Sequence, residues 1–522
     1  MMVMRMRDLD PINKLRPLVG GFEPGTVCLV GAGPGDGGLI SVRGAARLMQ
    51  ADVVLYGSRI EPELLMLPRA EARRIRAGGG GEQPLWPLDQ LNNELVRYAK
   101  EGKRVVWLED GDPFLLSRGA ETCQHLAGAG IHYEVVPGIT AALAGAVTAG
   151  IPPTHPGVSR AVALVDGRGD PADSGGLDFM AMARMETIAI YLELGELAAN
   201  CQGLIAAGMD PKTPVAVTQG ACLPRQRTVV GTLETIAAQA ASERIESPAL
   251  VLIGRTVALR QSIEWFENRP LHGQTIVVTR MEHEAGDLSG PLQLLGANVI
   301  CAPTIELREV EDYAKVDKAL RKVDQYDWLV LTSGNGVEAL FRRLEHLGLD
   351  GRVLAGVKIA VVGTGTAARL REFGIRADLI PPEAVGESLA EALLAQDIRK
   401  KRVLMLRADI ARSRLREILT KAGAHCDDLP VYRTACPERL PETFIEHLDQ
   451  GQVDWITLTS PSSMINLLAL LGRERSKALW SLKLASIGPV TTRAIRKLGF
   501  IEAAEANPYN IPGLVEAIRY AQ

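Results

Sequence analysis

The second half of the sequence repeats itself, and this repeat constrains the fold more than any other feature. DWLVLTSGNGV begins at Asp327 and DWITLTSPSSM begins at Asp454, 127 residues later, with five identities in 11 positions. IVVTR at Ile276 and VLMLR at Val403 are also separated by 127 residues. VKIAVVGTGTAARLREFGI at Val357 recurs 125 residues later as LKLASIGPVTTRAIRKLGF. A nearly constant offset in three blocks indicates a duplicated α/β unit.

Each repeated block is a β-branched run that ends in Thr, Ser or Gly and leads into an amphipathic stretch. This pattern is typical of a strand, an N-capped turn and a helix. Such turns direct hydroxyl and backbone N–H groups beyond the strand ends, where helix dipoles favour an anion. Four of them suit a cleft for a large polycarboxylate, although a plain helix cap explains any single turn equally well. The candidate substrate-binding residues are Thr332, Ser333, Gly363, Thr364, Ser460, Ser462, Gly488 and Thr491.

In the first half, a glycine-rich turn, LVGAGPGDGG from Leu29 to Gly38, follows a short apolar run. A dinucleotide-binding turn needs G-x-G-x-x-G, with an acidic residue after the next strand to hold the ribose. Here Asp36 is in the sixth position, Pro34 has no N–H for a phosphate, and Gly57 stands where the acidic residue belongs. The pattern therefore argues against a dinucleotide site.

Further turns follow β-rich runs along the same half: EDGDPF from Glu109, RGAE from Arg118 and PGITAA from Pro137. The carboxyl ends of parallel strands converge on one crevice. Any one of these turns is more often structural than functional. Three in order along one α/β pattern favour a binding site.

Composition narrows the class of protein. A length of 522 residues suggests three or four domains, and 47% hydrophobic with 23% charged residues is typical of globular protein. The net charge of −4 gives no reason to expect nucleic acid or an anionic membrane as a partner. No stretch resembles a signal peptide or is long enough to span a bilayer. Seven scattered cysteines indicate reduced thiols in a cytoplasm, and the histidines form no metal-binding motif.

Six stretches between about Gly25 and Arg260 follow one family pattern: LVGAGPGD, ADVVLY, EGKRVVWLEDGDPF, VVPGITAALAGAVTAGIPPTH, IYL and VVGTL. In them the first half resembles the tetrapyrrole methylases, above all uroporphyrinogen-III C-methyltransferase, which uses S-adenosylmethionine. The resemblance implies two α/β domains with the cofactor between them, and commonly a homodimer. The cofactor-binding residues that it implies are Pro34, Asp110, Gly111, Asp112, Leu115, Thr140, Ala141, Leu192 and Gly220.

Three departures from the family pattern bear on the methyl acceptor. YDRLV, whose aspartate is assigned as the base, reads YGSRI here, with Gly57 in the aspartate position. The family pattern GKR, which supplies a catalytic lysine, corresponds here to RAGGGGEQ, which has no lysine. In THP, Pro156 stands where the family has a basic residue. LYGSRIEPELL is closer to sister methylases that act on later corrinoid intermediates. Arg59 and Glu61 are the nearest polar candidates for a substitute role, although a solvated pair explains them as well.

The second half, from about Gly273 to Gln522, resembles uroporphyrinogen-III synthase in TSGNGV, AVVGTGTAARLREFG, PVYRT, TSPSS, IGPVTTRAIRKLG and NIPGLVEAI. Such enzymes close hydroxymethylbilane to uroporphyrinogen III, with inversion of ring D and without a cofactor. The resemblance implies two flavodoxin-like parallel-sheet domains, 312–430 and 273–311 with 431–522, joined by two connecting strands. Tyr432 falls on the family's tyrosine, proposed to assist loss of the hydroxyl as a proton donor, although a packed tyrosine is also consistent.

The predicted α/β chain therefore has an extension at 1–24, a two-domain tetrapyrrole methylase fold at 25–260, a linker at 261–272 and a synthase fold at 273–522. The implied reactions are consecutive, because the synthase makes the uroporphyrinogen III that the methylase consumes. We expect a bifunctional cytoplasmic enzyme that leads towards precorrin-2, sirohaem or cobalamin. Two alternatives stay open: the first half methylates another corrinoid precursor, or it is a non-catalytic module that binds the cofactor or dimerises.

Overall fold

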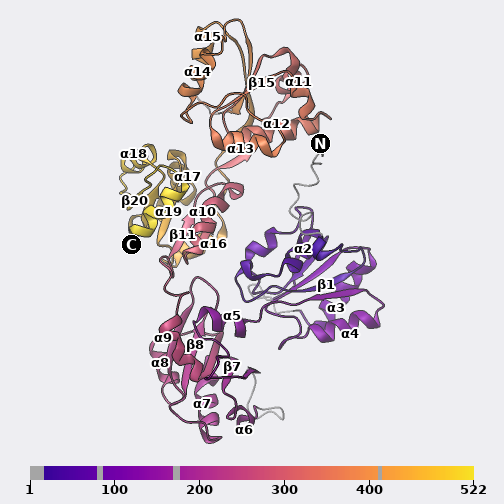
Figure 1. Ribbon diagram of the computed structural model, residues 1–522, viewed down its shortest axis with the longest axis vertical. Helices are drawn as coiled ribbons and strands as arrows, with labels where there is room; N and C mark the ends of the chain where they lie inside the picture. The colour runs from indigo at the N-terminus through magenta and orange to yellow at the C-terminus, as the bar shows by residue number, and fades with distance from the viewer. Residues whose placement is uncertain (1–16, 79–85, 168–176, 410–413, 522) are drawn as a thin grey trace. The chain divides into compact units, whose positions relative to one another are not determined.

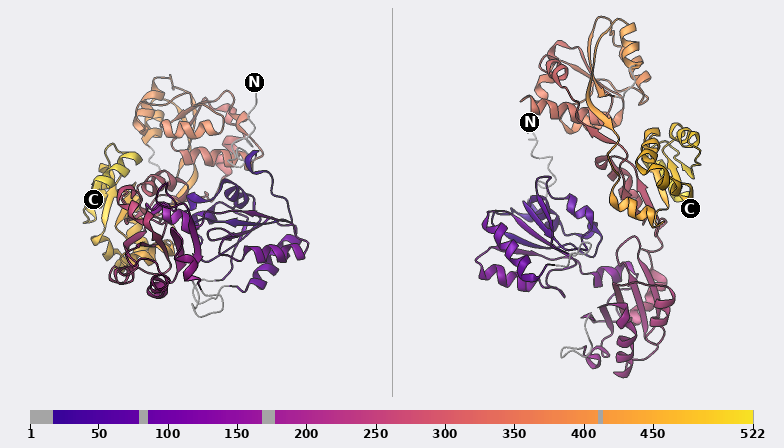
Figure 2. Two further views of the ribbon diagram at one scale, coloured as in Figure 1. Left: turned by 60° about the horizontal axis from the view of Figure 1, so that its bottom comes forward. Right: turned by 180° about the vertical axis from the view of Figure 1, so that it is seen from behind.

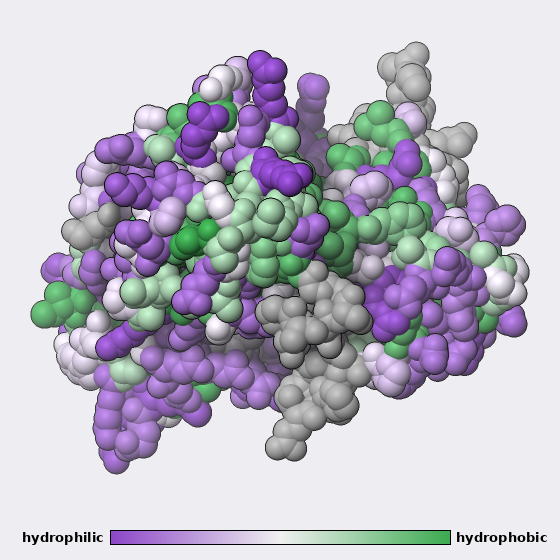
Figure 3. All heavy atoms as spheres, turned by 90° about the horizontal axis from the view of Figure 1, so that it is seen from below, coloured by the Kyte–Doolittle hydropathy of each residue, from purple (hydrophilic) through white to green (hydrophobic). Residues whose placement is uncertain are grey.

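The computed structural model describes residues 17–78, 86–167, 177–409 and 414–521 (Figures 1 and 2). The chain divides into two compact units, Met1–Thr275 with Gly290–Val299, and Ile276–Ser289 with Ile300–Gln522. The described residues form an α/β fold with four five-stranded sheets, two in the methylase-like half and two in the synthase-like half. Hydrophilic and hydrophobic residues are intermixed on the face drawn in Figure 3. No helix within the described ranges is long and apolar enough to cross a bilayer.

The first sheet is entirely parallel. Its elements are β1 (Val27–Gly31), α2 (Val42–Gln50), β2 (Val53–Tyr56), β3 (Arg73–Arg76), α3 (Leu88–Lys100), β4 (Val105–Glu109), α4 (Gly119–Gly128) and β5 (Tyr133–Val136). The strand order is β3-β2-β4-β1-β5. Along β1, Val27 and Leu29 pack into one core layer while Cys28 and Val30 pack into the other, because successive side chains point to opposite faces. Because β1, β4 and β5 are parallel, the turns that follow them all lie at the carboxyl ends of the strands.

The second sheet is mixed. Its elements are α5 (Ala141–Thr148), β6 (Val162–Asp166), α6 (Phe179–Met182), β7 (Thr187–Leu192), α7 (Leu197–Ala206), β8 (Pro214–Gln219), β9 (Arg227–Thr232), α8 (Ile236–Ser242), β10 (Ala249–Gly254) and α9 (Arg260–Ile263). In the order β6-β7-β10-β8-β9, only β6 and β7 pair in parallel. Helix α5 carries small residues against this sheet: a methyl group added at Gly145 would lie 2.8 Å from the Leu250 side chain. This close packing places the start of α5, with the PGITAA turn, beside the second sheet.

Two further sheets form the synthase-like half. Their strands are β11 (Thr275–Val278), β12 (Asn298–Cys301), β13 (Glu306–Arg308), β14 (Trp328–Leu331), β15 (Lys358–Val361), β16 (Arg402–Ala408), β17 (His425–Ala435), β18 (Trp455–Leu458), β19 (Lys483–Ser486) and β20 (Ala504–Glu505). The orders are β12-β11-β18-β19-β20 and β13-β17-β16-β14-β15. Counted from β11, the first is the flavodoxin-like order 2-1-3-4-5. In the second, the four strands from β14 to β17 follow the order 2-1-3-4, and the place beside β17 is taken by β13, which precedes them in the chain. Strand β13 pairs antiparallel with β17, whereas β14, β15, β16 and β17 pair in parallel.

Helices cover both faces of these sheets. They are α10 (Glu282–Leu294), α11 (Ala314–Leu320), α12 (Gly334–His346), α13 (Thr364–Glu372), α14 (Gly386–Leu394), α15 (Arg414–Lys421), α16 (Glu442–Asp449), α17 (Pro461–Arg475), α18 (Pro489–Lys497) and α19 (Ile511–Tyr520). In β14, Leu329 and Leu331 pack in the core layer of α11, α12 and α13, while Trp328 and Val330 pack in that of α14 and α15. The strand is an unbroken apolar run because both of its faces are buried.

The two copies of the sequence repeat exchange strands. The offset of 127 residues maps β11 onto β16 and β14 onto β18, so the first copy holds β11 to β15 and the second holds β16 to β20. Yet β11 and β12 share a sheet with β18, β19 and β20, whereas β16 and β17 share one with β13, β14 and β15. Each sheet is therefore composite, and neither copy contains a complete sheet.

This exchange makes a prediction about fragments. A fragment of residues 273–399, one copy of the repeat, should not fold as a monomer, because both of its strand groups lack partners. A fragment of residues 312–435 should fold, because it keeps β14, β15, β16 and β17 and loses only the edge strand β13. Far-ultraviolet circular dichroism and thermal unfolding of the two fragments check this. A cooperative transition in monomeric 273–399 would contradict the exchanged arrangement.

Candidate functional site

Three turns at the edge of the first sheet meet in direct backbone contact. A methyl group added at Gly31, the last residue of β1, would overlap Gly138 in the turn after β5, and one added at Gly138 would overlap the carbonyl oxygen of Gly111. The N–H of Gly111 donates to the carbonyl oxygen of Gly33 over 2.9 Å. Gly31 and Gly138 are therefore required to be glycine by the close approach of these turns.

Asp112 ties two of these turns together. Its Oδ1 accepts from the N–H of Phe114 over 2.8 Å, and its Oδ2 accepts from the N–H of Gly138 over 3.0 Å. Both carboxylate oxygens are thus engaged by backbone groups of the turns after β4 and β5. This predicted cofactor-binding side chain therefore holds the turns after β4 and β5 together.

The start of α5 is fastened to the second sheet by a tyrosine. The Tyr191 hydroxyl, at the end of β7, forms a hydrogen bond with the Thr140 hydroxyl and accepts from the N–H of Ala142 over 2.7 Å. Leu192, the predicted residue, is buried with its side chain in the core of the second sheet. The sequence analysis identified Leu192 and missed Tyr191, although Tyr191 is the tyrosine of the same IYL motif.

The remaining predicted cofactor residues lie on loops next to these turns and at the start of α5. Pro34 is half-buried between Gly33 and Gly35, whose φ angles are 87° and 116°. A methyl group added at Gly35 would lie 3.0 Å from the Leu223 side chain, which belongs to the loop that begins at Gly220. The loops after β1 and β8 therefore touch each other. Ala141 begins α5, and Leu115 is half-buried in the loop after β4.

A polar group lies beside the altered YGSRI segment. Arg59 pairs with Asp110, with 2.7 Å between its Nε and the Asp110 Oδ2. Burial raises the pKa of the Glu61 carboxyl, with Glu63 adding to the rise and Arg225 opposing it. Arg59 thus has a carboxylate partner other than Glu61. Most of the lysine-free stretch RAGGGGEQ falls outside the described residues, and Pro156 is exposed.

In the second unit, the eight predicted substrate-binding residues lie just after the carboxyl ends of β14, β15, β18 and β19. The Ser333 Oγ accepts from the N–H of Gly336 over 3.0 Å, and the Ser460 Oγ accepts from the N–H of Ser463 over 3.2 Å. These serines therefore cap α12 and α17, which is what the interpretation of the turns as plain helix caps predicts. Thr364 is exposed, whereas Thr491 is buried.

A cavity of about 420 Å³ lies at the carboxyl ends of β11, β18 and β19. It brings Ser460 together with residues that the turn pattern did not identify. Its lining consists of Thr279, Arg280, Met281, Ile305, Thr459, Ser460, Ser463, Ile487, Tyr509, Asn510 and Ile511. The lining combines hydroxyl groups, a guanidinium and apolar side chains, which suits an organic molecule that carries carboxylates. Ser462, Gly488 and Thr491 are not part of the lining.

Tyr432 lies in β17 beside a second, smaller cavity of about 170 Å³. Its hydroxyl is 3.0 Å from the Ser333 Oγ, so the structure brings together two residues predicted from separate motifs. Its lining carries charges of both signs: Arg308, Arg342, Arg343, Glu309 and Glu338, with His346 beside them. No cluster of three or more potential metal-ligating side chains occurs in the part of the chain that the structure describes.

Comparisons with known proteins cover both halves of the chain. The family of uroporphyrinogen-III synthase HemD matches residues 286–516, and the family of tetrapyrrole (corrin/porphyrin) methylases matches residues 26–237. The porphyrin biosynthesis protein HemD of Ruminiclostridium josui is 33% identical over 477 residues, which are 91% of this chain and 94% of that protein.

Other relatives match a little under half of this chain. The siroheme synthase of Azotobacter vinelandii is 42% identical over 247 residues, 47% of this chain and 53% of that protein. A crystal structure of uroporphyrin-III C-methyl transferase from Thermus thermophilus, complexed with S-adenyl homocysteine, is 31% identical with a TM-score of 0.38. It aligns with 45% of this chain and 99% of that one.

Proposed function

Because the chain belongs to the family in which a tetrapyrrole methylase is fused to a uroporphyrinogen-III synthase, we propose that it performs both reactions in sequence. It closes hydroxymethylbilane to uroporphyrinogen III with inversion of ring D, and it then methylates this product towards precorrin-2. The observation that carries this proposal is the presence of both family regions, in this order, in one chain. The regions 25–260 and 273–522 are assigned to the two activities.

For the methylase half, S-adenosylmethionine supplies the methyl group when bound. The proposed cradle is the crevice of glycine turns that Asp112 holds together, closed by Thr140 and the loop from Gly220. Its principal task is to align the two reactants, and positioning alone contributes about 7–11 kcal/mol to lowering a barrier. Because Gly57 replaces the family's aspartate base, we expect slow or restricted methylation of uroporphyrinogen III.

For the synthase half, we assign the cavity beside Ser460 and Arg280 to the carboxylates of the substrate. Backbone N–H groups at the helix starts and the guanidinium of Arg280 attract these carboxylates. The Tyr432 hydroxyl, supported by Ser333, donates a proton to the hydroxyl group that leaves as water. Ring closure then needs no group from outside the protein and its substrate.

One observation favours a second candidate for the first half. The segment YGSRI lacks the aspartate of the uroporphyrinogen-III methylase pattern and is closer to methylases of later corrinoid intermediates. In that case the synthase activity is unchanged, and the methyl acceptor is another corrinoid precursor. A non-catalytic cofactor-binding module is the third candidate. A homodimer and a cytoplasmic location stay predictions.

One assay tests the proposed function. The full chain is supplied with hydroxymethylbilane, with and without S-adenosylmethionine; chromatography separates the uroporphyrinogen isomers and mass spectrometry counts added methyl groups. We expect isomer III in both reactions, and slowly formed methylated products only with S-adenosylmethionine. Isomer I alone would contradict the synthase assignment, and unmethylated isomer III in both reactions would contradict methylation of this substrate.

The cofactor crevice gives a prediction for Asp112. Asp112→Ala should weaken binding of S-adenosyl homocysteine by about 100-fold, because two backbone donors lose charged acceptors whose bonds are worth about 1.5–3 kcal/mol each. Calorimetry on the full chain measures this affinity. Asp178→Ala is the control, because the Asp178 carboxylate caps α6 and should leave the affinity unchanged. Equal affinities in the wild type and Asp112→Ala would remove Asp112 from the site.

The tyrosine of β17 gives a second prediction. Tyr432→Phe should slow the conversion of hydroxymethylbilane by about 100- to 10,000-fold, the usual contribution of one general acid. Stability should change little, because the ring stays in place and the hydroxyl that bonds to Ser333 is removed without a change in packing volume. Tyr326→Phe is the matched control, since it removes a hydroxyl that donates to Asp427 over 2.5 Å. Unchanged turnover in Tyr432→Phe would make Tyr432 a packing residue.

A further inference from the structure

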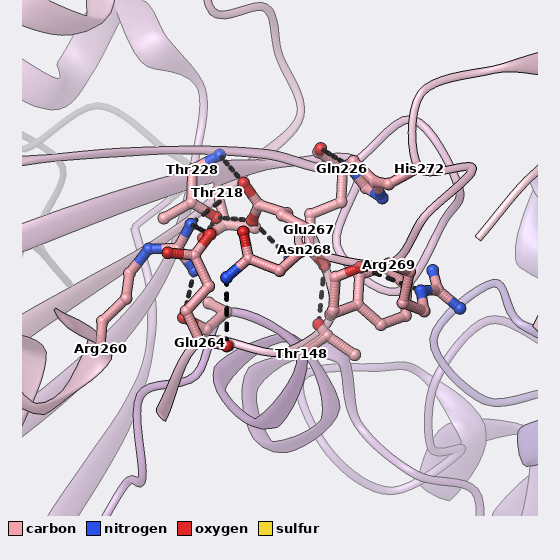
Figure 4. Close-up of polar contacts among 12 residues, drawn as sticks. Thr148, Thr218, Gln226, Thr228, Arg260, Glu264, Glu267, Asn268, Arg269 and His272 are labelled. Atoms are coloured by element: carbon pink, nitrogen blue, oxygen red, sulfur yellow. Dashed lines mark hydrogen bonds and ion pairs between the residues drawn. The ribbon is translucent and has the colours of Figure 1, made fainter. Parts of the chain in front are cut away.

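The segment between the two halves is bound to the methylase half by a buried polar network (Figure 4). We call residues 260–274 the strap. Arg260 is buried, and its guanidinium pairs with Glu264 over 2.7 Å and with Glu267 over 3.1 Å. The Trp265 indole N–H donates to the carbonyl oxygen of Val147 over 3.1 Å. The strap is therefore an ordered part of the methylase half rather than a free tether.

Gln226 is the centre of this network. Its side chain is fully buried, and its Oε1 accepts from the Thr148 hydroxyl over 2.7 Å and from the N–H of Cys222 over 2.8 Å. Its Nε2 donates to the Glu267 Oε1 over 2.8 Å. One amide thus connects the last residue of α5, the loop of residues 220–226 and the strap, as Figure 4 shows.

Glu267 supplies the acceptors that complete the network. Its Oε1 also accepts from the Thr228 hydroxyl over 2.6 Å, and its Oε2 lies 3.1 Å from the Arg260 guanidinium. The strap makes backbone contacts with the same loop. The His272 Nε2 is 2.9 Å from the carbonyl oxygen of Gln226. The N–H of Gly273 donates to the carbonyl oxygen of Pro224 over 3.3 Å.

Both elements held by this network carry proposed cofactor-binding residues. Helix α5 begins with Ala141, directly after Thr140, and the loop of residues 220–226 begins with Gly220. The loop also places the Leu223 side chain against the turn of Gly35. A shift of Gln226 therefore displaces two walls of the crevice at once, because buried polar networks have few alternative arrangements.

We propose that Glu267 is a positioning residue for S-adenosylmethionine, acting through Gln226 on α5 and on the loop of residues 220–226. This inference rests on the proposed methylase function. It assigns a role in cofactor affinity to a residue of the connection to the synthase half. The strap also joins the beginning of the synthase sequence, since the N–H of Leu271 donates to Leu295 and that of Asn298 donates to Gln274, each over 2.8 Å.

The test is calorimetry of S-adenosyl homocysteine binding to the full chain. Glu267→Ala should weaken binding by about tenfold, in the range found for residues that act through others. Glu267→Gln should recover most of the affinity, because an amide oxygen still accepts from Gln226 and Thr228 while Glu264 stays paired with Arg260. Synthase turnover should be the same in both variants and shows that the second half is folded, while thermal unfolding shows whether the first half is.

The control is Asp52→Ala. Asp52 pairs with Arg104 over 3.0 Å before β2 and β4, at the opposite edge of the first sheet from the glycine turns. Its loss should lower the thermal midpoint without changing the affinity. If Glu267→Ala does not fold, Thr148→Val decides, because it removes only the hydroxyl that donates to Gln226 and should weaken binding about threefold.

The outcomes separate this inference from the function on which it rests. A wild-type chain that does not bind S-adenosyl homocysteine contradicts the proposed methylase function. Wild-type affinity in folded Glu267→Ala, or in Thr148→Val where that variant decides, overturns the positioning role and leaves the methylase function intact. Equal weakening in Asp52→Ala and Glu267→Ala also overturns it, since affinity would then follow stability alone.

Discussion

Parallel strand pairing is the constraint on which both halves of this chain depend. Two neighbouring parallel strands need a crossover between them, so every strand of such a sheet ends at the same edge. In the first sheet this brings the turns of Gly31, Gly111 and Gly138 into contact. In the second unit it gathers the turns after β11, β18 and β19 around one cavity. Sites built from short turns far apart in sequence follow directly from this geometry.

The exchange of strands between the repeat copies shapes the second unit. Each copy supplies strands to both sheets, and the chain passes between the sheets through β13 and β17, which pair antiparallel. Tyr432 lies in β17, where its hydroxyl reaches Ser333 in the turn after β14. Because Ser333 belongs to the first copy and Tyr432 to the second, this contact exists only in the exchanged arrangement.

Several side chains expected to bind a ligand also hold in place the loops on which they lie. Asp112 uses both carboxylate oxygens on backbone N–H groups, and Ser460 caps α17. Such residues affect a ligand through the geometry of the turns. Gln226 and Glu267 act in the same manner from further away, and their buried bonds make the strap part of the first half. A binding site made of backbone groups depends on these bonds, because a backbone N–H or carbonyl group changes position only when its whole loop moves.

The sequence by itself determined the α/β class, the duplication, the two family regions and the turns at the strand ends, because these depend on local patterns and short motifs. It also placed Ser333 and Ser460 at helix starts, where a serine hydroxyl meets a free N–H a few residues away. The tertiary structure alone decided that the copies exchange strands, that Tyr191 fastens α5, and that Gln226 meets Glu267 across 41 residues. Pairings between distant segments depend on which strands become neighbours in a sheet. Which strands become neighbours is determined by the packing of the whole core, and a local sequence pattern contains no information about that packing.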